Sequence, residues 1–308
     1  MQLFKSTLTF NFNKYTSITG IVSVLLILIS LFLVIINGLN LAVEFTGGTN
    51  LNLTLEKTSI SEFRENINNI LSQKVEVVEI ENNDSNSNFL LRTKFLEDES
   101  IMIDKLKLIY PSLELNSIDS FGPKLGAELQ SSARNAILLA LLLISLYIAI
   151  RFDRYYALGS LAALVHDVLI VLGFFSILNM EFDLTVLAAL LAVIGYSLND
   201  TIVVSDRIRE NFRKLRRINP EEVINISLTE TLGRTLVTSL TTMLVLISLA
   251  VLGGEMIHGF SIALLVGVIT GTYSSIYVAA NTLLVLGVTE EDLMIPVKEG
   301  ADQDELIP

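Results

Sequence analysis

The chain has 308 residues, of which 51% are apolar, and its mean hydropathy is +0.60. It has no cysteine and only two histidines, which excludes disulfides and thiol chemistry and argues against a histidine-rich metal site. The net charge of −12 argues against nucleic-acid binding, and the long uncharged runs indicate an integral protein of the lipid bilayer.

The apolar runs predict six membrane-spanning helices. A span needs about 20 mostly apolar residues to cross about 30 Å of hydrocarbon. We interpret the first run as a retained anchor and not as a signal peptide, because no small-residue cleavage site stands out after it. The predicted spans are residues 17–37, 133–150, 156–178, 184–205, 235–253 and 260–287.

The polar stretch between the first and second spans predicts a separate small α+β domain. Its apolar residues alternate in four segments and follow a helical period in two others. The resulting order β-α-β-β-α-β is the ferredoxin-like pattern. The expected strands are residues 50–56, 74–80, 88–93 and 112–118, and the expected helices are residues 59–72 and 97–110.

Lysine and arginine near the spans predict the orientation of the chain. Basic residues gather at alternate connections, whereas residues 179–183 and 254–258 contain none. Since cytoplasmic loops carry the excess of basic residues, both termini are expected in the cytoplasm and the α+β domain outside it. The basic positions are Lys5, Lys14, Arg151, Arg154, Arg207, Arg209, Arg213, Lys214, Arg216, Arg217 and Arg234.

Four regions follow from these patterns. Residues 1–37 form a cytoplasmic N-terminus and the first span, and residues 38–132 form the outer domain. Residues 133–288 form a five-helix membrane bundle, and residues 289–308 form an acidic cytoplasmic tail.

The chain lacks the common catalytic motifs. It contains no GxxxxGK[ST], no GxSxG, no HExxH and no dinucleotide fingerprint. We therefore expect no enzyme activity, no metal and no organic cofactor, and we look for function among polar residues at membrane depth.

His166 and Asp167 lie about eleven residues into the third predicted span, which is about 16 Å deep and close to the midplane. A charge at that depth is costly, and such residues usually face a bundle interior or a water-filled path. Asp167 is thus a candidate site of proton uptake and release. The alternative is a hydrogen-bonded aspartate that only holds helices together, and for His166 that structural role is the favoured one.

The fourth predicted span contains Tyr196, Asn199 and Asp200 and ends in a burst of charge. Tyr196, Asp200 and Arg207 have the spacing i, i+4 and i+11, so they share one helical face, and Asn199 lies on the adjacent stripe. Asp200 and Arg207 are about 10 Å apart along the axis, too far for an ion pair. The spacing fits polar steps toward the cytoplasm, although Arg207 also fits an ordinary solvated helix end.

Two glycine-containing motifs complete the pattern. Gly267 and Gly271 have GxxxG spacing in the last span, which favours close helix packing inside the protein. Just outside the first span, Gly47 and Gly48 predict a tight turn or bulge before a strand.

Several strings together resemble the SecF family, the smaller subunits of the SecD–SecF protein-export complex. They are VEFTGGT (43–49, with Glu44, Phe45, Gly47, Gly48 and Thr49), FGPKLGAEL (121–129), ALVHDVLI (163–170), VIGYSLNDTIVVSDRIRENFRKLRR (193–217), GTYSSIYVA (271–279) and EGADQ (299–303). The similarity runs over nearly the whole chain.

The resemblance implies a fold like that of resistance-nodulation-division transporters, in the bacterial inner membrane, with the small domain in the periplasm. It implies a heterodimer with SecD that associates with the SecY–SecE–SecG channel. Such a complex uses the proton-motive force, with protons as the coupling ion, to help preproteins leave the channel after the ATPase SecA has driven their entry. It places Asp167 in the proton pathway together with an arginine, here Arg207 with Arg209 as the alternative.

Two other functions stay open. One is a proton-coupled small-molecule efflux protein of the same superfamily. The other is a non-transporting assembly scaffold, whose buried polar residues only hold helices together.

Overall fold

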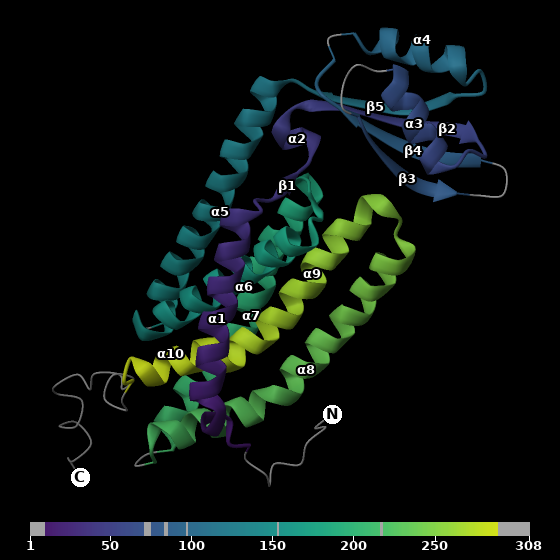
Figure 1. Cartoon of the computed structure of the whole chain (residues 1–308). Helices are drawn as coiled ribbons and strands as arrows, with labels where there is room; N and C mark the ends of the chain where they lie inside the picture. The colour runs from purple at the N-terminus through teal and green to yellow at the C-terminus, as the bar shows by residue number, and fades with distance from the viewer. Residues whose placement is uncertain are drawn as a thin grey trace, which may run out of the picture.

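The computed structural model describes residues 10–70, 75–82, 86–96, 98–152, 154–215 and 218–288. The acidic tail, Lys5, Arg216 and Arg217 lie outside the described residues. A bundle of long helices carries the small α+β domain, called here the sheet domain, at one end (Figure 1). The start of α1 and the end of α10 lie at the opposite end of the bundle (Figure 1).

In the part of the chain that the structure describes, six helical segments are long and apolar enough to cross a membrane, which confirms the six predicted spans. Several extend beyond their apolar runs. α8 begins at Pro220 instead of residue 235, because Asn219 caps the helix by accepting a hydrogen bond from the Glu221 N–H and proline suits the first turn. The segments are α1 (Thr16–Ile36), preceded by η1 (Phe12–Tyr15), α5 (Pro123–Arg151), α6 (Arg154–Leu178), α7 (Leu184–Lys214), α8 (Pro220–Leu252) and α9 (Glu255–Ser274), which continues through the π-helix η2 (Ser275–Ala279) into α10 (Ala280–Val285).

The sheet domain confirms the predicted ferredoxin-like order. Its antiparallel strands lie in the order β3-β4-β2-β5. Alternate residues of β2 and β4 are buried under the two helices, where Phe63 stacks on Phe89 at 4.5 Å between ring centroids. The elements are β2 (Gly48–Glu56), α3 (Ile60–Ile70), β3 (Glu76–Asn82), β4 (Asn86–Thr93), α4 (Glu99–Ile109) and β5 (Glu114–Phe121).

A compact junction joins the sheet domain to the bundle. β1 (Asn40–Leu41) pairs in parallel with β6 (Glu181–Phe182), which lies between α6 and α7. The short helix α2 (Val43–Thr46) follows, and Gly47 ends it at φ +76°, a conformation that side chains with a Cβ rarely adopt. The predicted tight turn before the first strand therefore lies at Gly47, where an added Cβ would come within 2.8 Å of the Pro123 Cα.

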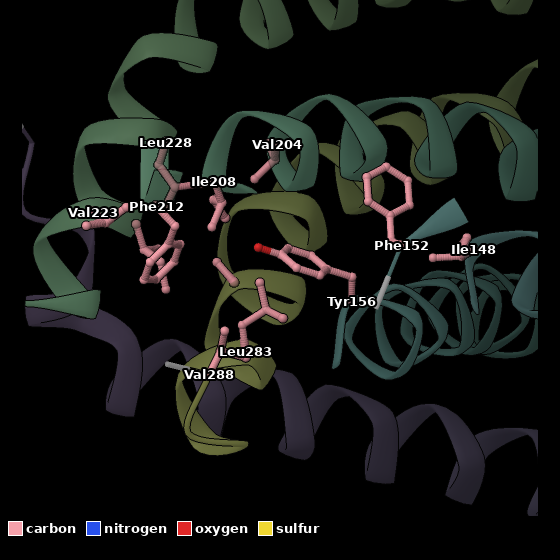
Figure 2. Close-up of a cluster of buried hydrophobic side chains, with 12 residues drawn as sticks. Ile148, Phe152, Tyr156, Val204, Ile208, Phe212, Val223, Leu228, Leu283 and Val288 are labelled. Atoms are coloured by element: carbon pink, nitrogen blue, oxygen red, sulfur yellow. The ribbon is translucent and has the colours of Figure 1, made fainter. Parts of the chain in front are cut away.

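The bundle has an inner and an outer set of helices. α6, α7 and α9 bury many of their side chains, whereas α1, α5 and α8 expose long apolar faces. Near the end opposite the sheet domain, Tyr156 projects into an apolar cluster built from α5, α6, α7, α8 and the C-terminal segment (Figure 2). A second apolar cluster around Phe175 and Leu190 fills the end near the sheet domain. The polar residues of the candidate site lie between or beside these clusters.

The close contact between Ser30 of α1 and Gly173 of α6 gives a test of the packing. An alanine Cβ at Gly173 would lie 2.8 Å from the Ser30 Cα and 2.4 Å from its Oγ, so backbone must move. We expect Gly173→Ala to lower the free energy of unfolding by about 1–3 kcal/mol, the usual cost of overpacking. Thermal unfolding in detergent, followed by circular dichroism, measures the change. Gly195→Ala on α7 is the control, because nothing lies within 4 Å of its added Cβ, and an equal loss in both variants would contradict this packing.

Candidate functional site

α7 and α9 meet closely in the middle of the bundle because Gly267 and Gly271 of α9 leave room for Val193 and Ser197 of α7. An added Cβ at Gly267 would lie 2.1 Å from a Val193 methyl carbon, and one at Gly271 would lie 3.1 Å from the Ser197 Cβ. The predicted GxxxG stripe is therefore placed inside the protein, against α7. This close approach brings hydroxyl groups of α7 and α9 within reach of α6.

The Asp167 carboxyl lies at this meeting point and is only 1% exposed. The hydroxyls of Ser197 on α7 and Ser274 on α9 donate to its Oδ2, at 2.6 and 2.7 Å. The His166 Nδ1 lies 2.9 Å from its Oδ1. Both oxygens are thus bonded, which compensates for removal of the carboxyl from water and joins three helices at one group.

His166 connects this network toward α1. Its ring is fully buried and stacks on the Tyr273 ring, with 5.9 Å between centroids and 26° between planes. The Tyr273 hydroxyl donates to the Thr19 carbonyl at 2.9 Å and lies 3.0 Å from the Ser23 Oγ. Among the described residues, the His166 Nε2 is a buried atom without a hydrogen-bond partner. The imidazole can therefore hold a proton toward Asp167 while its other nitrogen stays free.

The backbone that carries Ser274 is irregular. The α-helix α9 ends at Ser274, and the following residues form the π-helix η2. Single π-turns inside α-helices are frequent at functional sites because they change the register of the residues that follow. One of the two hydroxyl donors to Asp167 therefore lies at a point where the helix geometry changes.

Asp200 is a second buried carboxyl, 4% exposed and one turn beyond Ser197 along α7. Its Oδ2 has no hydrogen-bond partner among the described residues. The positive charge of Arg234 on α8 is close enough to act on it. In contrast to Asp167, Asp200 has a buried oxygen without a hydrogen-bond partner among the described residues, and the charge of Arg234 acts on it.

The shared face predicted for Tyr196, Asp200 and Arg207 looks toward α8. The Tyr196 hydroxyl donates to the Thr242 Oγ1 at 3.4 Å, and the Arg207 Nε donates to a Glu230 oxygen at 2.7 Å. Arg234 acts on Asp200 between these two contacts. As the residue number rises along α7, the number of the corresponding residue on α8 falls, as expected for antiparallel helices. The face thus forms three polar levels between α7 and α8.

Arg207 does not lie beside Asp167 or Asp200. It binds Glu210 as well as Glu230, and Lys214 also pairs with Glu210. The Asn211 amide donates to Glu230 at 2.7 Å. Arg207 therefore belongs to a network at the end of α7. Asn199 lies on the exposed surface of the chain, away from the bundle interior.

Residue patterns alone missed several members of these networks. Arg234 was placed just outside the fifth span, whereas α8 begins at Pro220 and carries Arg234 well inside a continuous helix. The capping signal at Asn219-Pro220 was the available clue. No such signal marks Ser197, Ser274 and Tyr273 in the sequence. A serine or tyrosine in a span has the same sequence context whether or not its hydroxyl reaches a carboxyl group.

The motif near the first span lies apart from the carboxyl groups, at the junction. Phe45 is buried and contacts Phe182, and the Gln130 amide donates to its carbonyl at 3.0 Å. The Thr49 Oγ1 lies 2.9 Å from the Ser120 Oγ. Burial raises the pKa of Glu44 above the ordinary range of a glutamate. The motif therefore holds the sheet domain to the bundle and supplies one acidic group there.

Comparison with known families gives two matches. The family described as "Protein export membrane protein SecD/SecF, C-terminal" matches residues 101–289. The family described as "SecD/SecF GG Motif" matches residues 32–59, which include the glycine pair of the junction.

Curated relatives match over nearly their full length. The protein translocase subunit SecF of Vibrio alginolyticus is 42% identical over 315 residues, which cover 99% of each chain. That of Escherichia coli O157:H7 is 42% identical over 300 residues, which cover 93% of this chain and 91% of the relative.

Solved structures match as well. A crystal structure of SecDF, a translocon-associated membrane protein from Thermus thermophilus, superposes with a TM-score of 0.81 at 35% identity. The match covers 92% of this chain but 39% of that chain, so this chain corresponds to about two fifths of the SecDF polypeptide. A super-membrane-facing form of SecDF gives a TM-score of 0.71.

The hydroxyl donors to Asp167 provide a test of the network. We expect Ser274→Ala to lower the free energy of unfolding by about 1–3 kcal/mol, because a buried acceptor loses a donor. Thermal unfolding in detergent measures the loss. Ser248→Ala is the matched control, since that exposed hydroxyl bonds to the Leu244 carbonyl of its own helix. Equal stability of the two variants would show that Ser274 does not support Asp167.

Proposed function

The chain belongs to the SecF family of protein translocase subunits, and from this premise we propose that it is the SecF-type half of a proton-driven protein-export complex. Its six apolar helices and its family make it a multi-pass inner-membrane protein. The relatives carry the name of protein translocase subunits, which favours export of preproteins over small-molecule efflux.

The proposed orientation places both termini in the cytoplasm and the sheet domain in the periplasm. The connection from α6 to α7 and the start of α9 contain no basic residue and lie at the end of the bundle that carries the sheet domain (Figure 1). Arg151, Arg154 and the basic end of α7 lie at the opposite end. This distribution supports the orientation through the excess of basic residues in cytoplasmic loops.

The proposed partner is SecD, through the surface formed by α7 and α8. The SecDF structure is a longer chain of which this chain matches 39%, and the unmatched part of that chain supports SecD as the partner. Asn199 and Arg234 are exposed on the isolated chain although they lie within long apolar helices. Polar groups at such positions are costly in lipid and usually face protein or water, which supports a partner at this surface.

The observation that carries the proton-coupled function is the pair of buried carboxyl groups at successive depths. Asp167 lies about 16 Å from the outer end of α6, and Asp200 lies about 24 Å from the outer end of α7, at 1.5 Å per residue. Ser197, which bonds to Asp167, is one turn from Asp200 on the same helix. Such steps give a proton a route from the midplane toward the cytoplasm.

The two carboxyls suit different roles in this proposal. Asp200 has an oxygen without a hydrogen-bond partner among the described residues and is under the influence of the Arg234 charge, so gain or loss of its proton changes the attraction between α7 and α8. Asp167 joins α6, α7 and α9, so its protonation changes how three helices are held together. One charge moved through 100 mV is worth about 2.3 kcal/mol, and a few protons per cycle are enough to drive a domain movement.

The rest of the proposed cycle lies outside the membrane. The complex associates with the SecY–SecE–SecG channel, and movement of the periplasmic domains prevents an emerging preprotein from sliding back. The sheet domain is positioned for this movement because its junction with the bundle is short and contacts the turn between α6 and α7.

We expect Asp200→Asn to abolish the part of preprotein export that depends on the proton gradient, because an amide side chain neither gains nor loses a proton near neutral pH. Export into inverted membrane vesicles, with and without a gradient, measures it. Asp206→Asn, an exposed carboxylate on the same helix, is the control and keeps the wild-type response. Gradient-stimulated export by an intact Asp200→Asn complex would contradict the proposal.

Asp167→Asn separates the coupling role from the structural role of the buried network. If Asp167 is part of the proton route, we expect normal amounts of complex with no gradient stimulation. Quantification of the assembled complex beside the export rate makes the distinction. Low yield with normal stimulation per complex would assign Asp167 to helix packing alone, as in the scaffold alternative.

A further inference from the structure

One cation at the junction lies among several acidic groups. Arg92 of β4 forms an ion pair with Glu181 of β6, which directly links the sheet domain to the turn between α6 and α7. Both side chains are partly buried, with 16% and 26% exposed. Asn40, Glu76 and Lys94 line the same cavity of about 350 Å³ as this pair.

Acidic groups on several neighbouring elements act on the pair. Glu44 of α2, Asp183 before α7 and Glu76 of β3 act on Glu181, and Asp119 of β5 acts on Glu44. Arg92 opposes them, and Lys94 is the other basic side chain lining the cavity. The carboxyls outnumber the cations here, so a charge on Glu181 is attracted by Arg92 and repelled by its other neighbours.

The junction is also incompletely hydrogen-bonded. Among the described residues, the Glu44 Oε2 and the Arg92 Nε are buried atoms without a partner. A buried ion pair contributes to stability only when its remaining polar atoms are satisfied. The attraction between Arg92 and Glu181 is therefore nearly offset by the cost of removing their charges from water. A change in the charge of Glu181 is then enough to change the stability of the contact.

Among the described residues, short backbone contacts also tie the junction to this turn, and they include the Ala42 N–H, which donates to the Phe182 carbonyl at 3.1 Å. β1 and β6 pair over two residues on each side, and the Asn40 amide donates to the Asn179 carbonyl at 3.1 Å. A pairing this short contributes little by itself. The Arg92–Glu181 contact adds a side-chain ion pair from β4 to these short backbone contacts.

We propose that Arg92 and Glu181 form a proton-sensitive latch that holds the sheet domain on the bundle while Glu181 is neutral and releases it when Glu181 is charged. The latch goes beyond the buried carboxyl groups of the bundle, because it lies at the junction and senses the pH on the side of the sheet domain. The latch itself does not depend on the orientation proposed above. Only the conclusion that it senses the pH of the periplasm rests on that proposal.

The direction of the effect follows from proton linkage. The pKa of Glu181 is raised to about 7, mainly by burial. Arg92 lowers this pKa by less than burial raises it, and Glu44, Asp183 and Glu76 add to the rise. Once the domain lifts and water reaches Glu181, its pKa returns toward the ordinary value of 4.5. The docked state then binds the proton more tightly, so docking is favoured below the docked pKa and weakens as the pH rises toward 7.

The expected size is a change of up to about tenfold in the ratio of docked to undocked molecules per pH unit between about 5 and 7. Above pH 7 the ratio levels off, because Glu181 is then charged in both states. In the proposed cycle, an acidic periplasm keeps the domain seated, and loss of the Glu181 proton frees it.

Pulsed electron resonance distances in the complex with SecD test the latch. The chain has no cysteine, so spin labels at Lys107→Cys on α4 and Met256→Cys on α9 are specific when the SecD partner is also cysteine-free. Both positions are exposed and lie on opposite sides of the junction. Distances in lipid nanodiscs at pH 5.5, 7 and 8.5 need neither a gradient nor a preprotein, so they can fail independently of the export proposal.

We expect the short-distance population of the wild-type sequence to fall between pH 5.5 and 7. Glu181→Gln, which mimics the neutral carboxyl, keeps the domain docked at all three pH values. Arg92→Gln lowers the docked population at pH 5.5, where the wild type is docked, because Glu181 loses the hydrogen bond that Arg92 donates to it. Glu56→Gln changes an exposed carboxylate at the end of β2 and keeps the wild-type response.

Two results would overturn the latch. One is a wild-type distance distribution that does not change with pH, which needs no variant to fold. The other is a Glu181→Gln complex that responds to pH like the wild type or that is undocked throughout.

Discussion

A carboxyl group in the middle of an apolar bundle has to be neutral or fully hydrogen-bonded, and the packing around Asp167 follows from that requirement. Ser197 and Ser274 reach the carboxyl because α9 approaches α7 along Gly267 and Gly271. The same group therefore determines where small residues are needed and which helices form the inner layer. The outer helices then cover this layer with apolar side chains.

The contact between α7 and α8 extends the polar interior toward one end of the bundle. Its levels pass from a neutral hydroxyl pair at Tyr196, through Asp200 and Arg234, to the network around Arg207 and Glu230. Exposure rises from 4% at Asp200 to 33% at Arg207, so the cost of charge is lower at the Arg207 level than at the Asp200 level. A gradient of this kind favours proton movement between a dry centre and water, and its open side at Arg234 leaves room for a partner subunit.

Much of the fold was predictable because it depends on periodicity. Alternation identified the strands of the sheet domain, and apolar runs identified six spans, which the helices confirm. The site was less predictable because it depends on contacts between distant residues. Arg207 has the right spacing from Asp200, yet its carboxylate neighbours Glu210 and Glu230 hold it elsewhere. Arg234 was assigned only to the basic loop before the fifth span, because hydropathy marks the apolar part of α8 and misses its polar first half.

The central claim is that a buried carboxyl of α7 gains and loses a proton in the working range of the complex. Infrared difference spectra of the complex with SecD in nanodiscs, recorded between acid and alkaline pH, measure this directly. A Glu181→Gln background removes the carboxyl of the junction from the signal. We expect a carboxylic-acid band that titrates in this background and loses the Asp200 contribution in Asp200→Asn. A titrating band that persists unchanged in Asp200→Asn, or no titrating band at all, would contradict it.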